Sequence, residues 1–191
     1  MPRTIADLTW PVTTERLSLR PAEQRDAAAT FAFRSLPEVA EWITSRTTDL
    51  EAWEAGFGDR LVDTLVIELD GTVVGDLMLR VQDAWAQTEV RHLAAGAEAE
   101  IGYTVDPAYG GRGLATEAAQ ALLAIAFDGL GVRRVIAQCF ADNIASWKLM
   151  ERLGMRREQH TKQESLHRSG EWLDGMMYAI LAEEWRAAQQ S

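Results

Sequence analysis

The stretch EIGYTVDPAYGGRGLATEAAQALLAIAF, residues 100–127, constrains the fold more than any other part of the sequence. Its first residues are typical of a strand, and its last residues place alanine and leucine at helical spacing. Gly110, Gly111 and Gly113 lie between them, and glycine lets a backbone bend sharply or approach a ligand closely. Because the first amides of a helix have no partner within it, this order of elements predicts a phosphate cradle. The same spacing fits a loop that only turns into a helix equally well.

Two well-known phosphate motifs fit this stretch poorly. A Walker loop would end in Gly-Lys-Ser/Thr, whereas Leu114 follows Gly113. The dinucleotide fingerprint is nearer, since Gly111 and Gly113 supply two of its three glycines. However, DPAY separates the strand from the turn, and no acidic residue stands about 20 positions further on. An NAD(P)-dependent oxidoreductase is therefore a minor alternative.

A third motif fits better. The residues YGGRGLATEA resemble the pyrophosphate loop of the GNAT N-acetyltransferase superfamily, in which Gln or Arg, two variable residues, Gly, a variable residue and Gly or Ala lead into a helix. Gly113 and Ala115 match, whereas Gly110 stands where the family has a side chain. EIGYTVDP and NIASWKLMERLGM resemble the neighbouring segments of that family. TERLSLRP and EWLDGMMYAILAEEW resemble its RimJ/RimL-type branch, so the resemblance covers nearly the whole chain in the right order.

The remaining patterns predict one mixed-sheet α/β domain with helices on both faces. A strand is expected at residues 16–21, a hairpin across Asp70-Gly71, and a helix after Asp49 as its N-cap. A helix that begins near residue 26 should break at Pro37, and a final hairpin should precede a helix or tail. The resemblance implies a single GNAT domain over residues 1–191, with a mostly antiparallel sheet that splays in the middle. Residues 1–12 and 187–191 are expected to be flexible.

The resemblance also implies acetyl-CoA as co-substrate, lying between strands at 100–105 and 133–140. The backbone of the first strand would pair with the pantetheine arm, the glycine turn would hold the pyrophosphate, and an asparagine would touch the cofactor. Asn143 is also a favoured N-cap residue of its own helix, and the two roles are compatible. The implied cofactor-binding residues are Tyr103, Thr104, Val105, Gly110, Gly111, Arg112, Gly113, Leu114, Ala115, Thr116 and Asn143.

The chemistry of amine acetylation needs a neutral amine, donors for the oxyanion and a proton for the departing thiolate. Some family members use a tyrosine as that acid, but Met150 stands at the matching position. Ser146 matches the acid or thiolate-stabilising serine of RimL-like enzymes, although a helical serine is most often only solvated. Glu100 is preferred to Glu98 as the base, although either fits an exposed strand carboxylate at least as well. An α-amine, with a pKa of about 7.7 to 8.0, needs only a weak base or a water relay.

Composition limits the partners. Asp and Glu outnumber Lys and Arg by 29 to 19, which argues against a nucleic-acid partner because such a partner requires a basic face. Cys139 is the only cysteine and is expected to be a buried structural thiol. With a single cysteine and three histidines that lack ligand spacing, no metal site is predicted. No apolar run approaches the length of a membrane span, and the first residues do not resemble a signal peptide. A cytoplasmic protein with no membrane partner is expected.

The resemblance therefore implies an N-acetyltransferase that moves an acetyl group from acetyl-CoA to a primary amine by direct attack in a ternary complex. The acceptor is a protein N-terminus or a small-molecule amine, expected near residues 34–55 and the hairpin HRSGEW. The main alternative is a GNAT-fold module that binds CoA without catalysis, which Gly110 and the missing tyrosine keep open. A homodimer is compatible with both.

Overall fold

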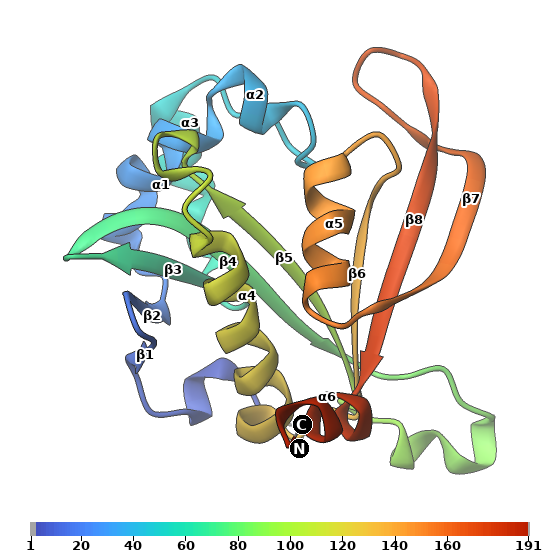
Figure 1. Ribbon diagram of the computed structural model, residues 1–191. Coiled ribbons are helices and arrows are strands. Elements are labelled where there is room, and N and C mark those ends of the chain that lie inside the picture. The colour runs from blue at the N-terminus through green and yellow to red at the C-terminus, as the bar shows by residue number, and fades with distance from the viewer. Residues whose placement is uncertain (1–2, 191) are drawn as a thin grey trace. The chain divides into compact units, whose positions relative to one another are not determined.

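The computed structural model describes residues 3–190. Residues 1, 2 and 191, which fall in the segments expected to be flexible, lie outside the described residues. The strands are β1 (Val12–Thr13), β2 (Leu17–Pro21), β3 (Thr64–Leu69), β4 (Thr72–Gln82), β5 (Glu98–Val105), β6 (Arg134–Phe140), β7 (Arg156–Leu166) and β8 (Trp172–Leu181) (Figure 1). The sheet has the strand order β1-β2-β3-β4-β5-β6-β8-β7. This mixed, mostly antiparallel sheet confirms the predicted α/β class.

Helices lie between several of these strands along the chain. The α-helices are α1 (Ala27–Arg34), α2 (Pro37–Ala40), α3 (Leu50–Gly56), α4 (Leu114–Ala124), α5 (Ile144–Arg152) and α6 (Ala182–Gln189). Short 3₁₀ turns are η1 (Ile5–Asp7), η2 (Gln24–Asp26), η3 (Phe57–Arg60), η4 (Thr88–Leu93) and η5 (Pro107–Tyr109). A π-helical segment, η6 (Ile125–Leu130), continues α4.

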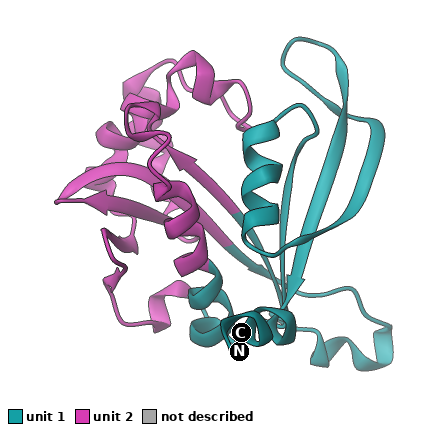
Figure 2. Cartoon of the chain, viewed as in Figure 1, with its two compact units in different colours: residues 1–4, 80–101, 123–191 teal, residues 5–79, 102–122 magenta. Residues whose placement is uncertain are grey.

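The chain forms two compact units, coloured separately in Figure 2. The first, here called the N-terminal unit, comprises residues 5–79 and 102–122. The second, the C-terminal unit, comprises residues 1–4, 80–101 and 123–191. The chain passes from one unit to the other within β4, β5 and α4, so these three elements contribute residues to both.

The N-terminal unit contains an antiparallel ladder of β1, β2, β3 and β4. The β3–β4 hairpin turns at Asp70 and Gly71, whose φ angles are 50° and 78°, as the sequence predicts for a tight hairpin. The break at Pro37 is also confirmed, because α1 ends at Arg34 and Pro37 occupies the first turn of α2. Asp49 caps α3 by accepting a hydrogen bond from the Ala52 amide at 2.9 Å.

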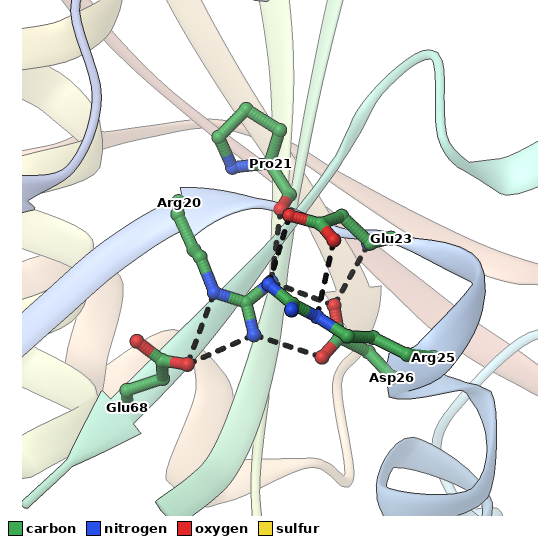
Figure 3. Close-up of polar contacts among 6 residues, drawn as sticks. All are labelled: Arg20, Pro21, Glu23, Arg25, Asp26 and Glu68. Carbon is green, nitrogen blue, oxygen red and sulfur yellow. Dashed lines mark hydrogen bonds and ion pairs between the residues drawn. The ribbon is translucent and has the colours of Figure 1, made fainter. Parts of the chain in front are cut away.

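A partly buried ionic contact fixes the start of α1 to the sheet (Figure 3). Arg20, near the end of β2, donates to both carboxylate oxygens of Asp26 at 2.7 and 2.8 Å, and also to Glu68 on β3. Burial alone would raise the pKa of Asp26, but the hydrogen bonds from Arg20 and from the Glu23 amide outweigh it and lower that pKa. The charged Asp26 therefore stabilises the folded unit. The adjoining core consists of Ala22, Ala27, Trp53, Phe57 and Val66.

The C-terminal unit joins the first residues of β5 in parallel to β6, which pairs with β8 in antiparallel fashion. The predicted final hairpin is confirmed as β7 and β8. Helix α5 packs against these strands and begins and ends close to the predicted bounds (Figure 1). The ring of Trp185 on α6 lies 5.4 Å from that of Phe127, so the last helix is anchored by aromatic contact.

Candidate functional site

The turn after β5 has the geometry that its glycines predict. The Asp106 amide donates to the Val74 carbonyl at 2.8 Å, and the Asp106 carboxylate accepts from the Ala108 amide at 2.9 Å. The chain then reverses through Gly111 and Gly113, whose φ angles are 70° and 78°. These angles lie in the left-handed region, where residues with a Cβ atom are strained. Glycine is therefore strongly favoured at both positions for this path into α4.

The start of α4 offers backbone donors next to this turn. The amide of Glu117 makes the bond to the Gly113 carbonyl at 3.1 Å, so the amides of residues 114–116 precede it and have no partner within the helix. A Cβ atom added at Gly111 would meet nothing within 4 Å. Open space above glycine backbone, together with the amides of a helix start, fits a phosphate group. Leu114 is buried and fixes the helix to the core.

Gly110 differs from the other two glycines of the turn. Its φ of −63° and ψ of 163° suit any residue. A Cβ atom there would lie 3.0 Å from the Pro107 carbonyl oxygen, a tight contact with the backbone. The backbone conformation therefore does not require glycine at the position where the predicted motif has Gln or Arg.

A cation that sequence reasoning missed lies beside the turn. Arg16 donates through Nη1 to the Arg112 carbonyl at 2.9 Å and forms an ion pair with Glu117 on α4 at 2.6 Å. Thr14 also donates to Glu117, at 2.5 Å. Burial would raise the pKa of Glu117, but the hydrogen bonds from Thr14 and Arg16 outweigh it and lower that pKa. Thr14 and Arg16 of the segment TERL thus contact the start of α4. No spacing rule predicts these contacts, because the residues lie about a hundred positions apart in sequence.

In the C-terminal unit, Asn143 and Ser146 lie at the start of α5. The Asn143 side chain accepts a hydrogen bond from the Ser146 amide at 3.3 Å, which confirms its predicted N-cap role. Ser146 is half-buried and forms a hydrogen bond with the Cys139 thiol on β6. Burial raises the pKa of Cys139 in spite of that bond, so this half-buried thiol stays protonated. Met150, one turn further on, is buried and carries no proton donor.

The two candidate bases differ in their contacts. Glu98 forms an ion pair with Arg134 and accepts a hydrogen bond from Gln82 at 2.8 Å. Burial would lower the pKa of Arg134, but its bonds to Glu158 and Glu98 outweigh it and raise that pKa. Glu98 therefore belongs to an ionic network. Among residues 3–190, the Glu100 side chain has no hydrogen-bond or ion-pair partner, and it is half-buried. Of the two candidate bases, Glu98 is therefore the one held in an ion pair.

The predicted site residues thus gather in two sets. Residues 103–105 and 110–116 belong to the N-terminal unit, while Asn143, Ser146 and Glu100 belong to the C-terminal unit. In the described part of the chain, no three or more His, Cys, Asp or Glu side chains are grouped so that they would hold a metal ion. Likewise, none of the helices in residues 3–190 is long and apolar enough to cross a membrane.

Comparison with known proteins gives one consistent result. A family model described as "Acetyltransferase (GNAT) domain" matches residues 16–156. "Uncharacterized N-acetyltransferase YnaD" of Bacillus subtilis (strain 168) is 33% identical over 175 residues, which make up 91% of this chain and 98% of YnaD.

Solved structures agree with the sequence matches. An acetyltransferase (GNAT family) from Bacillus anthracis has a TM-score of 0.77 and 30% identity, and the match covers 91% of this chain and 99% of that one. Mycobacterium smegmatis RimJ, solved in complex with CoA-disulfide, has a TM-score of 0.70 and 26% identity, with 91% and 89% covered.

Proposed function

The chain belongs to the GNAT acetyltransferase family and is an N-acetyltransferase, and we propose that it transfers the acetyl group of acetyl-CoA to a primary amine by direct attack in a ternary complex. The observation that carries this proposal is the turn at Gly111 and Gly113. Its left-handed glycines and the amides of residues 114–116 fit the pyrophosphate of coenzyme A. The CoA complex of the RimJ relative supports the same ligand.

Binding of the cofactor is assigned mainly to the backbone. The amides from Gly111 to Thr116 hold the pyrophosphate, with Gly110 and Arg112 at the edge of the turn. The backbone of residues 103–105 pairs with the pantetheine arm in the manner of an added strand. Asn143 contacts the cofactor while it caps α5. Arg16 adds a positive charge next to Gly113, since its Nη2 would lie 3.6 Å from a Cβ atom placed there.

The chemistry assigned to the side chains is proton transfer. The acceptor nitrogen forms a bond to the acetyl carbon as the carbon–sulfur bond breaks. The excess proton of the amine passes to Glu100, directly or through water, and the Ser146 hydroxyl stabilises the departing thiolate and supplies its proton. Exchange with solvent then returns the proton to Ser146 and removes it from Glu100. The Asn143 cap fixes the Ser146 amide at the start of α5, so the hydroxyl is held at the positive end of the helix dipole.

The assignment to the RimJ/RimL-type branch is also part of the proposal. It is supported by the RimJ relative and by the resemblance of the first and last segments of the chain. A protein N-terminus or a small-molecule amine is then the acceptor, the protein acts in the cytoplasm, and a homodimer is compatible with this assignment.

The decisive experiment measures acetyl-CoA thioester consumption with a panel of amines and N-terminal peptides, followed by mass analysis of the product. Acetylation of a primary amine is the expected result. Thermal stabilisation by CoA without turnover of any acceptor would favour a non-catalytic CoA-binding module. Stabilisation by NAD(P) and none by CoA would favour an oxidoreductase instead.

The role of Ser146 has its own test. Ser146→Ala should lower kcat about 100-fold, the lower range for loss of a positioned proton donor, while the dissociation constant of CoA stays within about twofold. Ala145→Ser, which adds a hydroxyl at the preceding exposed position, is the control. An unchanged kcat in Ser146→Ala removes Ser146 from the mechanism.

A further inference from the structure

Two guanidinium groups gather around one tryptophan in the N-terminal unit. The Cζ atoms of Arg34 and Arg60 lie 5.7 and 4.6 Å from the ring centroid of Trp53. The indole is buried, and its Nε1 donates to the Ala27 carbonyl at 2.9 Å, so the ring is fixed. Together with Asp76 on β4, these residues are called the Trp53 cluster below. Cations stacked on an aromatic face are attracted to it, but they also repel each other.

The positive charge of Arg34 is compensated by an anion within the cluster. Its Nη1 lies 2.7 and 2.6 Å from the two carboxylate oxygens of Asp76, which is 5% exposed. The same nitrogen lies 3.4 Å from the Thr104 hydroxyl on β5. Its Nε is buried and has no hydrogen-bond acceptor within the described residues. A buried donor without a partner is costly, so the cluster retains an unused donor.

The positive charge of Arg60, in contrast, is not compensated by an ion pair within the described part of the chain. Its Nη2 donates to the Ser45 hydroxyl at 3.1 Å, and across residues 3–190 it forms no ion pair. Burial and then the charge of Arg34 lower the pKa of Arg60, and the opposing effects of Asp76 and Asp63 are smaller. A half-buried cation beside a like charge lacks the anion that normally stabilises such a group. The cluster therefore favours an anionic ligand.

We propose that the Trp53 cluster binds a carboxylate of the acceptor, so that the acceptor is a small amine that also carries a carboxylate, as an amino acid does. This inference rests on the proposed function. Arg60 supplies a half-buried guanidinium without an ion-pair partner among the described residues, and a guanidinium suits a planar carboxylate. Arg34 contacts Thr104, a residue of the strand assigned to the acetyl-CoA arm, so the cluster adjoins that strand within the N-terminal unit. Residues 34–55, which supply Arg34, Ser45 and Trp53, are also where the sequence predicts the acceptor.

The test compares L-amino acids with their carboxamides, which keep the amine and lose the negative charge. Rates are corrected for the fraction of neutral amine. The wild type should use the acids with a kcat/KM about 10- to 100-fold higher, as loss of a charge-assisted hydrogen bond implies. Arg60→Gln should lower the kcat/KM of the acids to that of the carboxamides. It should leave the kcat/KM of the carboxamides and the KM for acetyl-CoA unchanged. Arg60→Lys should retain part of the preference. Arg46→Gln, at an exposed position of the preceding loop, is the matched control and should change nothing.

The outcomes separate this inference from the proposed function. If the wild type acetylates amides as fast as acids, or if Arg60→Gln and Arg60→Lys both keep the full preference, the carboxylate site is overturned and the acetyltransferase assignment stands. If no amine in the panel is acetylated, the assignment of the reaction fails. Calorimetric titration with N-acetylglycine in the presence of CoA then decides the site. Binding that Arg60→Gln weakens tenfold or more supports it, and absence of binding to the wild type overturns it.

Discussion

The glycine turn at residues 110–113 and the Trp53 cluster belong to the same unit but differ in how they are built. The turn comes from one short run of sequence and presents backbone amides. The cluster takes its members from α1, α3, η3 and β4 and presents charged side chains. In the function proposed above, the backbone donors bind a ligand part that is constant, the pyrophosphate of CoA, whereas side chains are replaced one at a time without changing the path of the chain. Under that proposal, cofactor recognition is local in sequence and acceptor recognition depends on the tertiary fold.

The largest effect is expected from a substitution that disrupts the Trp53 cluster. Asp76→Asn removes the charge that compensates Arg34 and leaves a buried guanidinium, which should cost about 3 kcal/mol of the free energy of unfolding. Urea unfolding monitored by circular dichroism measures it. Asp59→Asn, at an exposed position of η3, is the control and should have an effect below about 0.5 kcal/mol. Equal effects of the two variants would show that the Arg34–Asp76 pair contributes little to stability.

The second largest effect is expected from a substitution in the glycine turn. Gly113→Asp puts a Cβ atom at a φ of 78° and a carboxylate beside the proposed phosphate site. The strain costs about 1 to 2 kcal/mol, and charge repulsion adds to it, so the dissociation constant of CoA should rise about 100-fold by calorimetry. Gly113→Ala, which has the strain without the charge, should show the smaller part of the loss. If CoA binds normally to Gly113→Asp, the pyrophosphate lies elsewhere.

A smaller effect tests whether the turn is truly independent of distant side chains. Arg16→Gln removes the ion pair with Glu117 and the bond to the Arg112 carbonyl. Because the Arg16 side chain is partly exposed to solvent, its ion pair is screened and contributes little. The dissociation constant of CoA should therefore rise only about fivefold, equivalent to about 1 kcal/mol. Arg25→Gln, which alters an exposed ion pair of the same unit, should leave CoA binding unchanged. A loss as large as that of Gly113→Asp would make the turn as dependent on long-range contacts as the cluster is.

The smallest effect concerns pH. The pKa of Glu117 is lower in the folded chain than its unfolded value of about 4.3, so the folded state binds fewer protons there. Its contribution to stability is complete above pH 4.3 and is lost as the pH falls through the lowered pKa. Urea midpoints of the wild type and Glu117→Gln should therefore converge on acidification below pH 4. Parallel curves from pH 7 to pH 3 would contradict this.

The sequence predicted those features whose cause lies within a few residues. The hairpin at Asp70-Gly71, the break at Pro37, the caps at Asp49 and Asn143 and the start of α4 each follow from one residue type at one position. The contacts of Arg16 with Glu117, and of Arg34 with Asp76, join residues 101 and 42 positions apart. No local rule pairs them, because many acidic residues are equally available to each arginine. The different surroundings of Glu98 and Glu100 likewise depend on Arg134, a residue of another strand.

Gly110 has an evolutionary consequence. Because its backbone angles suit any residue, Arg at this position requires only that the Pro107 carbonyl oxygen give way at its 3.0 Å contact with the new Cβ atom. A glycine codon becomes an arginine codon by one base change. The family pattern at this position is therefore a single base change away.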